Sequence, residues 1–237
     1  MSFQFTFANL EQEYQKLLDL GYQVLTCAQY VKEKSTLQNQ KILVNRIDID
    51  VSVKKAERLS DMFVRLGIPA TFFVRLHANE YNPFSFEHYR ILKKIKLAGH
   101  EIAYHSEVID QAEIWGESAE ACLLKDINVL EALLDIKVQG VASHGGMTGL
   151  NNLDFWRNRK PKDFGFLYEG YDQEASFNLF HESLYVSDSC WTYWKSYQQG
   201  KLLEGNHLSP AEHASKGRHL LYLTIHPETY FDRHFYE

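Results

Sequence analysis

Short apolar runs of strand length alternate along this chain with longer segments of helical periodicity, and this alternation narrows the folds open to it. Residues 41–47 (KILVNRI) and 70–74 (ATFFV) are such runs, and each is followed by a segment whose apolar residues recur at helical spacing. Strands that alternate with helices are typical of a largely parallel sheet covered by helices. The sequence therefore predicts an α/β protein.

Capping residues and apolar periodicity define the expected elements. Ser52 is a suitable N-cap for a helix that ends before Gly67, and Gly99 ends the next helix. The stretch 145–152 is expected to be a loop, and the tail 228–237 a final helix or an ordered aromatic arm. The other expected helices are 9–20, 85–97 and 118–134, and the expected strands are 22–26, 41–47, 70–74, 101–104, 138–142, 164–168, 184–186 and 219–225.

Size, charge and cysteine content limit the class of protein. The chain of 237 residues fits one domain over 1–237, in which residues 1–40 are an N-terminal helix and strand extension. A net charge of −6 does not favour nucleic acid as a partner, because phosphate binding requires clustered Lys and Arg. Three widely separated cysteines indicate a reducing compartment. Neither a signal peptide nor an apolar run of membrane-spanning length is found in the sequence, which predicts a cytoplasmic protein.

Polar residues collect at the ends of the predicted strands. Catalytic groups of parallel α/β barrels lie at the carboxyl ends of the strands, on one rim. Carboxylates and imidazoles gathered there are what a hydrolytic metal site requires. The residues that follow strand-like runs are Asp48 and Asp50, then His105, Ser106 and Glu107, then Ser143 and His144, and finally His226.

Each of these signals also has a structural interpretation. Asp48 and Asp50 are suitable helix N-cap residues before Ser52, and His226 before Pro227 is suitable for the end of a strand. What favours a site is that all of the signals occur at strand ends in one short chain. The aromatic residues Trp191, Tyr193, Trp194 and Tyr197 lie in a loop-rich region, where they can stack on sugar faces or anchor the loop. His100 is expected to be structural, and His77, His88, His181, His207, His213, His219 and His234 are expected to lie mostly at the surface.

The order of six short motifs is similar to that of the polysaccharide deacetylase (NodB-homology) superfamily. The motifs are RIDID, ATFFV, GHEIAYHSE, ASHGG, SDSCW and LTIHP, and together they cover roughly residues 41–227. The resemblance implies a distorted (β/α) barrel that holds a divalent ion, commonly Zn²⁺. It also implies removal of N- or O-acetyl groups from sugars, although some relatives hydrolyse other C–N bonds.

The resemblance assigns the metal site residue by residue. Asp48 matches the general base and Asp50 a metal ligand, although an isoleucine separates the pair and the two roles are open to reversal. His105 matches the first ligand histidine, but Ile109 occupies the position of the second and cannot bind metal. His144 or Glu107 is expected to replace it, and otherwise the site holds metal poorly or not at all. We favour His144, since hydrolytic zinc commonly uses imidazole and carboxylate together.

The remaining motifs assign the other catalytic roles. His226 matches the general acid, and Asp188 is expected to orient it. Trp191 completes that motif as a substrate contact, and the Gly145 amide is a candidate for stabilising an oxyanion. The motif that usually carries an arginine near the base has none here, so that arginine is expected to be lost.

The expected substrate is an acetamido sugar, either small and soluble or lipid-linked, as in a precursor of a surface polysaccharide. Two alternatives remain. The first is an amide hydrolase of the same superfamily that acts on a non-sugar C–N bond. The second is a non-catalytic relative that binds a glycan, which the loss of the second histidine favours.

Overall fold

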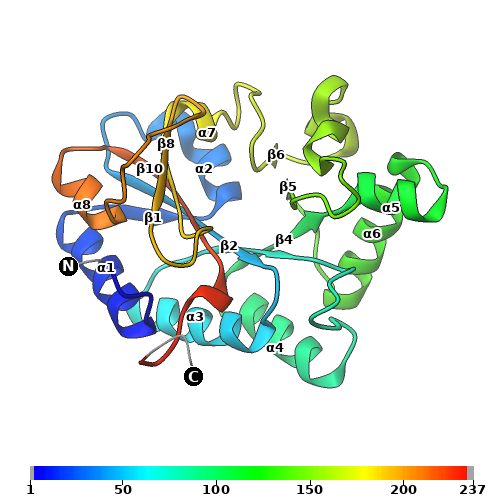
Figure 1. Cartoon of the computed structure of the whole chain (residues 1–237), viewed down its shortest axis with the longest axis horizontal. Helices are drawn as coiled ribbons and strands as arrows, with labels where there is room; N and C mark the ends of the chain where they lie inside the picture. Colours follow the sequence, from blue (N-terminus) through cyan, green and yellow to red (C-terminus); the bar gives the residue numbers. More distant parts are fainter. Residues whose placement is uncertain (1–2, 234–237) are drawn as a thin grey trace.

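The computed structural model describes residues 3–233, which form a large mixed sheet with helices on both of its faces (Figure 1). The sheet runs in the order β6-β5-β4-β3-β2-β10-β7-β8-β9. Every neighbouring pair from β6 to β7 is parallel, whereas β8 and β9 are added as antiparallel strands. The bounds are β2 (Ile42–Ile49), β3 (Thr71–Val74), β4 (Glu101–Ser106), β5 (Gly140–Ser143), β6 (Tyr168–Glu169), β7 (Leu184–Ser187), β8 (Lys195–Gln198), β9 (Lys201–Leu202) and β10 (Leu220–Ile225).

The predicted α/β class is thus confirmed, but the pairing of strands within residues 3–233 does not close the sheet into a barrel. Its two ends are the short strands β6 and β9. The N-terminal segment belongs to the same sheet, because β1 (Gln23–Leu25) pairs in parallel with the first half of β2. No helix of the described residues is long and apolar enough to cross a membrane.

Several helices begin and end where their sequences predict. Ser52 and Ser85 cap their helices through their side chains, and Gly67 adopts the left-handed conformation that ends the first of these. These two helices, together with α1 and α6, pack their apolar stripes against one face of the sheet (Figure 1). The bounds of the longer helices are α1 (Phe7–Asp19), α3 (Val53–Leu66), α4 (Phe86–Leu97) and α6 (Ala119–Leu134).

Other parts of the chain differ from the sequence prediction. The expected strand at 164–168 is wrong, because residues Pro161–Phe164 form a 3-10 helix and Gly165 then turns the chain in the left-handed region. Only Tyr168 of that range is in a strand. In the tail, Pro227–Thr229 is a 3-10 helix and Tyr230 is buried, while 234–237 lie outside the described residues. The sequence prediction missed the helices α2 (Cys27–Glu33), α5 (Val108–Trp115), α7 (Leu179–Glu182) and α8 (Pro210–Ser215), and the strands β8 and β9.

The two faces of the sheet carry different side chains because successive residues of a strand point to opposite sides. In β2, Leu43, Ile47 and Ile49 pack into the core under α1, α3 and α4. The alternate residues Ile42 and Val44 pack on the other face, against α2. We call the face that packs against α2 the inner face. The same alternation in β4 and β10 places polar residues on the inner face, at the carboxyl ends of these strands.

Candidate active site

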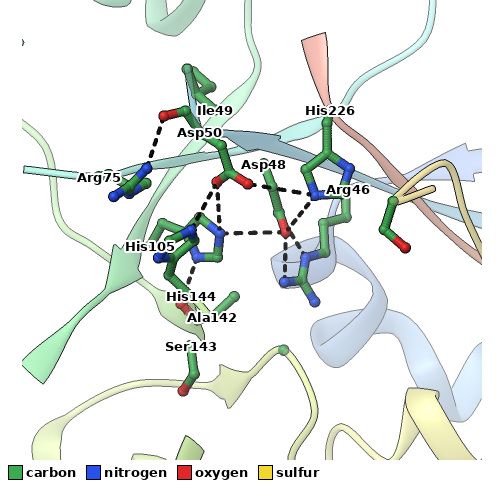
Figure 2. A network of polar contacts seen from close by, with 12 residues as sticks. Arg46, Asp48, Ile49, Asp50, Arg75, His105, Ala142, Ser143, His144 and His226 are labelled. Atoms are coloured by element: carbon green, nitrogen blue, oxygen red, sulfur yellow. Dashed lines mark hydrogen bonds and ion pairs between the residues drawn. The ribbon is translucent and has the colours of Figure 1, made fainter. Parts of the chain in front are cut away.

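Residues from the ends of β2, β4, β5 and β10 meet on the inner face of the sheet, at its carboxyl edge (Figure 2). The strand register places these ends side by side, since β2 pairs with both β3 and β10, and β4 with both β3 and β5. The residues brought together are Asp48, Asp50, His105, His144 and His226. They are the carboxylates and imidazoles that the sequence predicted at strand ends.

Asp48 is buried and held by an arginine from its own strand. Arg46 donates from Nε to Oδ1 and from Nη2 to Oδ2 of Asp48, both at 2.8 Å. The guanidinium is fully buried among the rings of Phe73, Tyr171 and Tyr222, and it also donates to the Tyr222 hydroxyl. Burial alone would raise the pKa of Asp48, but Arg46 lowers it below its usual value, so the carboxylate is ionised at neutral pH.

The motif at 143–146 lacks its usual arginine, but the carboxylate of Asp48 is nevertheless paired with an arginine. Arg46 supplies it from two positions before Asp48, so that both side chains lie on the same face of β2. The period of two along the strand was the signal that sequence reasoning could have used. The structural interpretation of Asp48 as a helix N-cap is also wrong, because Ser52 is the residue that caps α3.

His105 is oriented by the backbone of the neighbouring strand. Its Nδ1–H donates to the carbonyl oxygen of Ala142 at 2.9 Å, which leaves Nε2 facing two carboxylates. Nε2 lies 3.3 Å from Asp50 Oδ1 and 3.5 Å from Asp48 Oδ2. Burial alone would lower the pKa of His105, but the two carboxylates raise it above its usual value. A neutral His105 would turn a lone pair toward these oxygens, an arrangement that a proton or a bound cation stabilises.

His144 also faces Asp50, from the end of β5. Its Nε2 lies 3.8 Å from Asp50 Oδ1, and its Nδ1 lies 3.2 Å from Oε1 of Glu107. Glu107 is 2 % exposed and forms an ion pair with Arg75, whose Nη2 lies 2.8 Å from the same Oε1. Of the two candidates to replace the missing histidine, His144 thus faces the site directly, whereas Glu107 lies behind it.

His226 is held from the opposite side by Asp188. The fully buried Asp188 lies 2.5 Å from His226 Nδ1 and accepts a second hydrogen bond from the His226 amide at 2.9 Å. Nε2 of His226 then lies 3.8 Å from Asp50 Oδ2 and 4.0 Å from Asp48 Oδ2. Burial alone would lower the pKa of His226, but Asp188 raises it well above its usual value. Asp188 thus contacts and orients His226, as the sequence predicted.

The donor set fits a divalent cation in residue type. As the side chains stand, no group of three or more His, Cys, Asp or Glu residues within 3–233 forms a ready site for a metal ion. However, Asp50 Oδ1 is buried and accepts no hydrogen bond from any residue within 3–233. Two ligands of a tetrahedral zinc lie about 3.4 Å apart when each is at about 2.1 Å from the ion. The separation of Asp50 from His105 matches that value, and His144 is only slightly farther away.

Ile109 occupies the position at which the motif predicts a second ligand histidine, and its side chain packs against the core. Ile109 lies in the first turn of α5 and packs against the outer core, and its amide donates to Asn152 Oδ1. Asn152 is fully buried, and its side chain also donates to the carbonyl oxygen of His144 and to Asp110. Sequence reasoning missed Asn152 and Arg75, since neither carries a motif that marks it.

The candidate substrate contacts lie at the exposed rim. Gly145 follows His144 and is exposed, and no acceptor from residues 3–233 contacts its amide. Trp191 is 56 % exposed and has a positive φ of 63°, which is strained for a large residue. Its amide donates to the Asp188 carbonyl, which ties this rim residue to the turn that carries Asp188. Trp194 is fully buried and packs on Phe3 and Phe5, so it anchors the loop.

The remaining histidines divide as follows. His100 is buried and its Nδ1 accepts from the Ala70 amide, which agrees with the structural role predicted for it. His213 is an exception among the histidines expected to lie mostly at the surface, because it is buried and contacts Ser196. His234 lies outside the described residues.

Comparison with known proteins finds likeness only at the level of structure. No family model matches the sequence, and neither does any curated protein. IcaB from Ammonifex degensii aligns with a TM-score of 0.50 and 17 % identity, over 68 % of this chain and 74 % of that protein. A mutant CE4 family pseudoenzyme with restored enzymatic activity gives a TM-score of 0.48 and 17 % identity over 80 % of this chain. This chain spans 57 % of the length of that protein. At 17 % identity, the likeness to IcaB is a likeness of fold alone.

Proposed function

We propose that this chain, which has the fold of the polysaccharide deacetylases, is a metal-dependent hydrolase that removes an acetyl group from an acetamido sugar. One observation carries the proposal. An ionised carboxylate held by a buried arginine and an imidazole held by a buried carboxylate face each other across Asp50. A base and an acid on either side of a metal ligand are suited to metal-assisted hydrolysis of an amide.

Asp48 is the general base in this proposal. Arg46 holds both of its oxygens, and Oδ2 is the one that also faces His105 and His226. Asp48 accepts a proton from the attacking water while the oxygen of that water bonds to the acetyl carbon. The bidentate pair with Arg46 fixes the carboxylate of Asp48, so that it accepts the proton without first changing its side-chain rotamer.

His226 is the general acid. Asp188 holds Nδ1, so the proton on Nε2 is the one available to the leaving nitrogen. Cleavage of the C–N bond sends its electron pair to nitrogen, which takes that proton. The products are acetate and the free amino sugar.

Asp50, His105 and His144 are the residues that would hold the metal. A bound divalent ion, such as Zn²⁺, supplies the Lewis acidity that polarises the water and the acetamide carbonyl. Gly145, which follows His144 and is exposed, is the residue whose amide would donate to the oxyanion in this proposal. Trp191 offers an exposed indole face on which the sugar ring can stack.

Release of acetate from acetamido sugars tests this proposal directly. Purified protein loaded with Zn²⁺ or Co²⁺ is incubated with N-acetylglucosamine, its nucleotide-linked form, and short oligomers, and acetate is measured by a coupled assay. We expect acetate from at least one of these, and its loss in both Asp48→Asn and His226→Ala. Release of acetate that is unchanged in both variants would refute the assignment of base and acid.

A non-catalytic relative that binds a glycan is the second candidate. Ile109, which is partly buried against the core, occupies the position where a second ligand histidine is expected, and no ready metal site exists among the described residues. If this candidate holds, the protein binds acetamido oligosaccharides without releasing acetate, and Trp191→Ala weakens that binding. Calorimetry with the same oligosaccharides separates the two candidates.

A further inference from the structure

Glu107 is a buried carboxylate that the proposed reaction does not use. It is 2 % exposed and contacts two groups through one oxygen: Arg75 Nη2 at 2.8 Å and His144 Nδ1 at 3.2 Å. The two atoms lie within ion-pair distance, although their alignment is not that of a hydrogen bond. A carboxylate oxygen this close favours a proton on Nδ1, because an unprotonated Nδ1 would turn its lone pair toward the anion. The lone pair of a neutral His144 then lies on Nε2, the nitrogen that faces Asp50.

Arg75 links this pair to the metal-ligand strand. Its Nη2 holds Glu107, while its Nη1 donates to the backbone oxygen of Asp50 at 2.9 Å. Arg75 is itself held, since its amide donates to the hydroxyl of Tyr81, which in turn donates to Ile49 O. One guanidinium therefore sets the position of Glu107 relative to the end of β2. Figure 2 shows the contact of Arg75 with the end of β2.

The backbone of His144 is fixed independently of its ring. Its amide donates to Ser106 O at 3.0 Å, and its carbonyl oxygen accepts from Asn152 at 3.2 Å. With the backbone held on both sides, rotation of the ring is the remaining freedom of this residue. Glu107 is the group that contacts the ring on the side away from Asp50.

We propose that Glu107 is a positioning residue that fixes the tautomer and ring orientation of His144, and so makes His144 the ligand that stands in for Ile109. Carboxylates that hold the far nitrogen of a ligand histidine are general features of metal sites. The inference rests on the proposed function in one respect only, that the Nε2 lone pair serves a metal. The tautomer itself is a property of the metal-free protein.

The tautomer is read by ¹⁵N–¹H correlation spectroscopy of the metal-free protein at about pH 9, where an imidazole is neutral. The His144 signals are assigned by comparison with His144→Gln. We expect the Nδ1–H form in the wild type, and a shift toward Nε2–H in Glu107→Met, which removes the acceptor. Glu107→Gln retains an acceptor oxygen and is expected to rescue the wild-type tautomer. Glu80→Gln is the matched control, since Glu80 lies 3.7 Å from the same Arg75 on its exposed side.

Zinc affinity, measured by competition with a chromophoric chelator, is the second readout. Glu107→Met should weaken zinc binding by about 10–100-fold, the usual effect of losing such a partner, while Glu80→Gln leaves it unchanged. Glu107→Met leaves the buried charge of Arg75 without its carboxylate partner, which can unfold the protein. If circular dichroism shows that this variant is unfolded, the double variant Arg75→Met/Glu107→Met replaces it in both measurements.

The outcomes separate the inference from the proposed function. A wild-type His144 in the Nε2–H form, or an unchanged tautomer in Glu107→Met and the double variant, overturns the positioning role. The expected tautomers in a wild type that binds no zinc uphold the positioning role and refute the metal-dependent function. The expected tautomers together with weakened zinc binding support both.

Discussion

Replacing Arg46 by methionine tests whether the Arg46–Asp48 pair is as deeply buried as the structure describes. Arg46 has no exposed surface and Asp48 is 2 % exposed, so neither charge is solvated by water. Arg46→Met removes two charge-assisted hydrogen bonds and leaves the buried Asp48 without its hydrogen-bonded counter-charge, so that only the more distant His105 and His226 face it. Removal of one partner from such a pair costs about 3–5 kcal/mol of unfolding free energy. Because domains of this kind are stable by only about 5–15 kcal/mol, the variant should lose a large part of its unfolding free energy.

The assay is urea unfolding followed by circular dichroism, with two comparisons. Arg65→Met removes an exposed arginine that pairs with Glu11, and should cost no more than about 1 kcal/mol. The double variant Arg46→Met/Asp48→Leu removes both buried charges and should recover most of the lost stability, because the unpaired charge is gone. A cost for Arg46→Met that is no larger than the cost for Arg65→Met would refute the reasoning, as would a double variant less stable than Arg46→Met alone.

Three further predictions follow from the site and the core. Asp48→Asn should lower the rate of acetate release by about 10²–10⁴-fold while zinc binding is retained, and a variant with full activity would exclude Asp48 as the base. Burial lowers the pKa of His213, which contacts Ser196, from 6.5 to about 4, so its contribution to stability is complete above about pH 6.5 and is lost as the pH falls toward 4. Urea midpoints from pH 7 to 4.5 should fall less steeply in His213→Gln than in the wild type, and equal slopes would contradict this assignment. Gly140→Ala should destabilise the protein by about 1–3 kcal/mol, because a Cβ there would lie 2.1 Å from the Tyr168 ring, and an unchanged thermal midpoint would show that this contact is absent.

The fold was largely predictable from the sequence where apolar periodicity and caps agree. The helix after Ser52 and the strand around Phe72 were predicted because local propensity and burial favour the same structure. The strand expected at 164–168 was wrong because the glycine at 165 takes a left-handed conformation, which the apolar residues around it do not reveal. Helix α2 was missed because its capping box at Thr26 precedes a segment of mixed polarity.

The site was predictable in its composition but not in its connections. Strand ends predicted that Asp50 and His144 would meet, because parallel strands bring their carboxyl ends to one edge. The contacts of Arg75 and Asn152 depend on where loops return to the sheet, and no local pattern in the sequence records that. Arg46 is the exception, since alternation along β2 alone places it beside Asp48.

The alternation of β2 also has a consequence for how faithfully the chain folds. A slip of one residue against β3 and β10 would turn Arg46, Asp48 and Asp50 toward the apolar layer, and Ile47 and Ile49 toward the polar edge. Such a register would bury charges without partners, at a cost that apolar strands do not impose. The residues proposed for catalysis therefore also discriminate against mispaired strands. Variants that neutralise them should populate misregistered and aggregating species during refolding more than the wild type does.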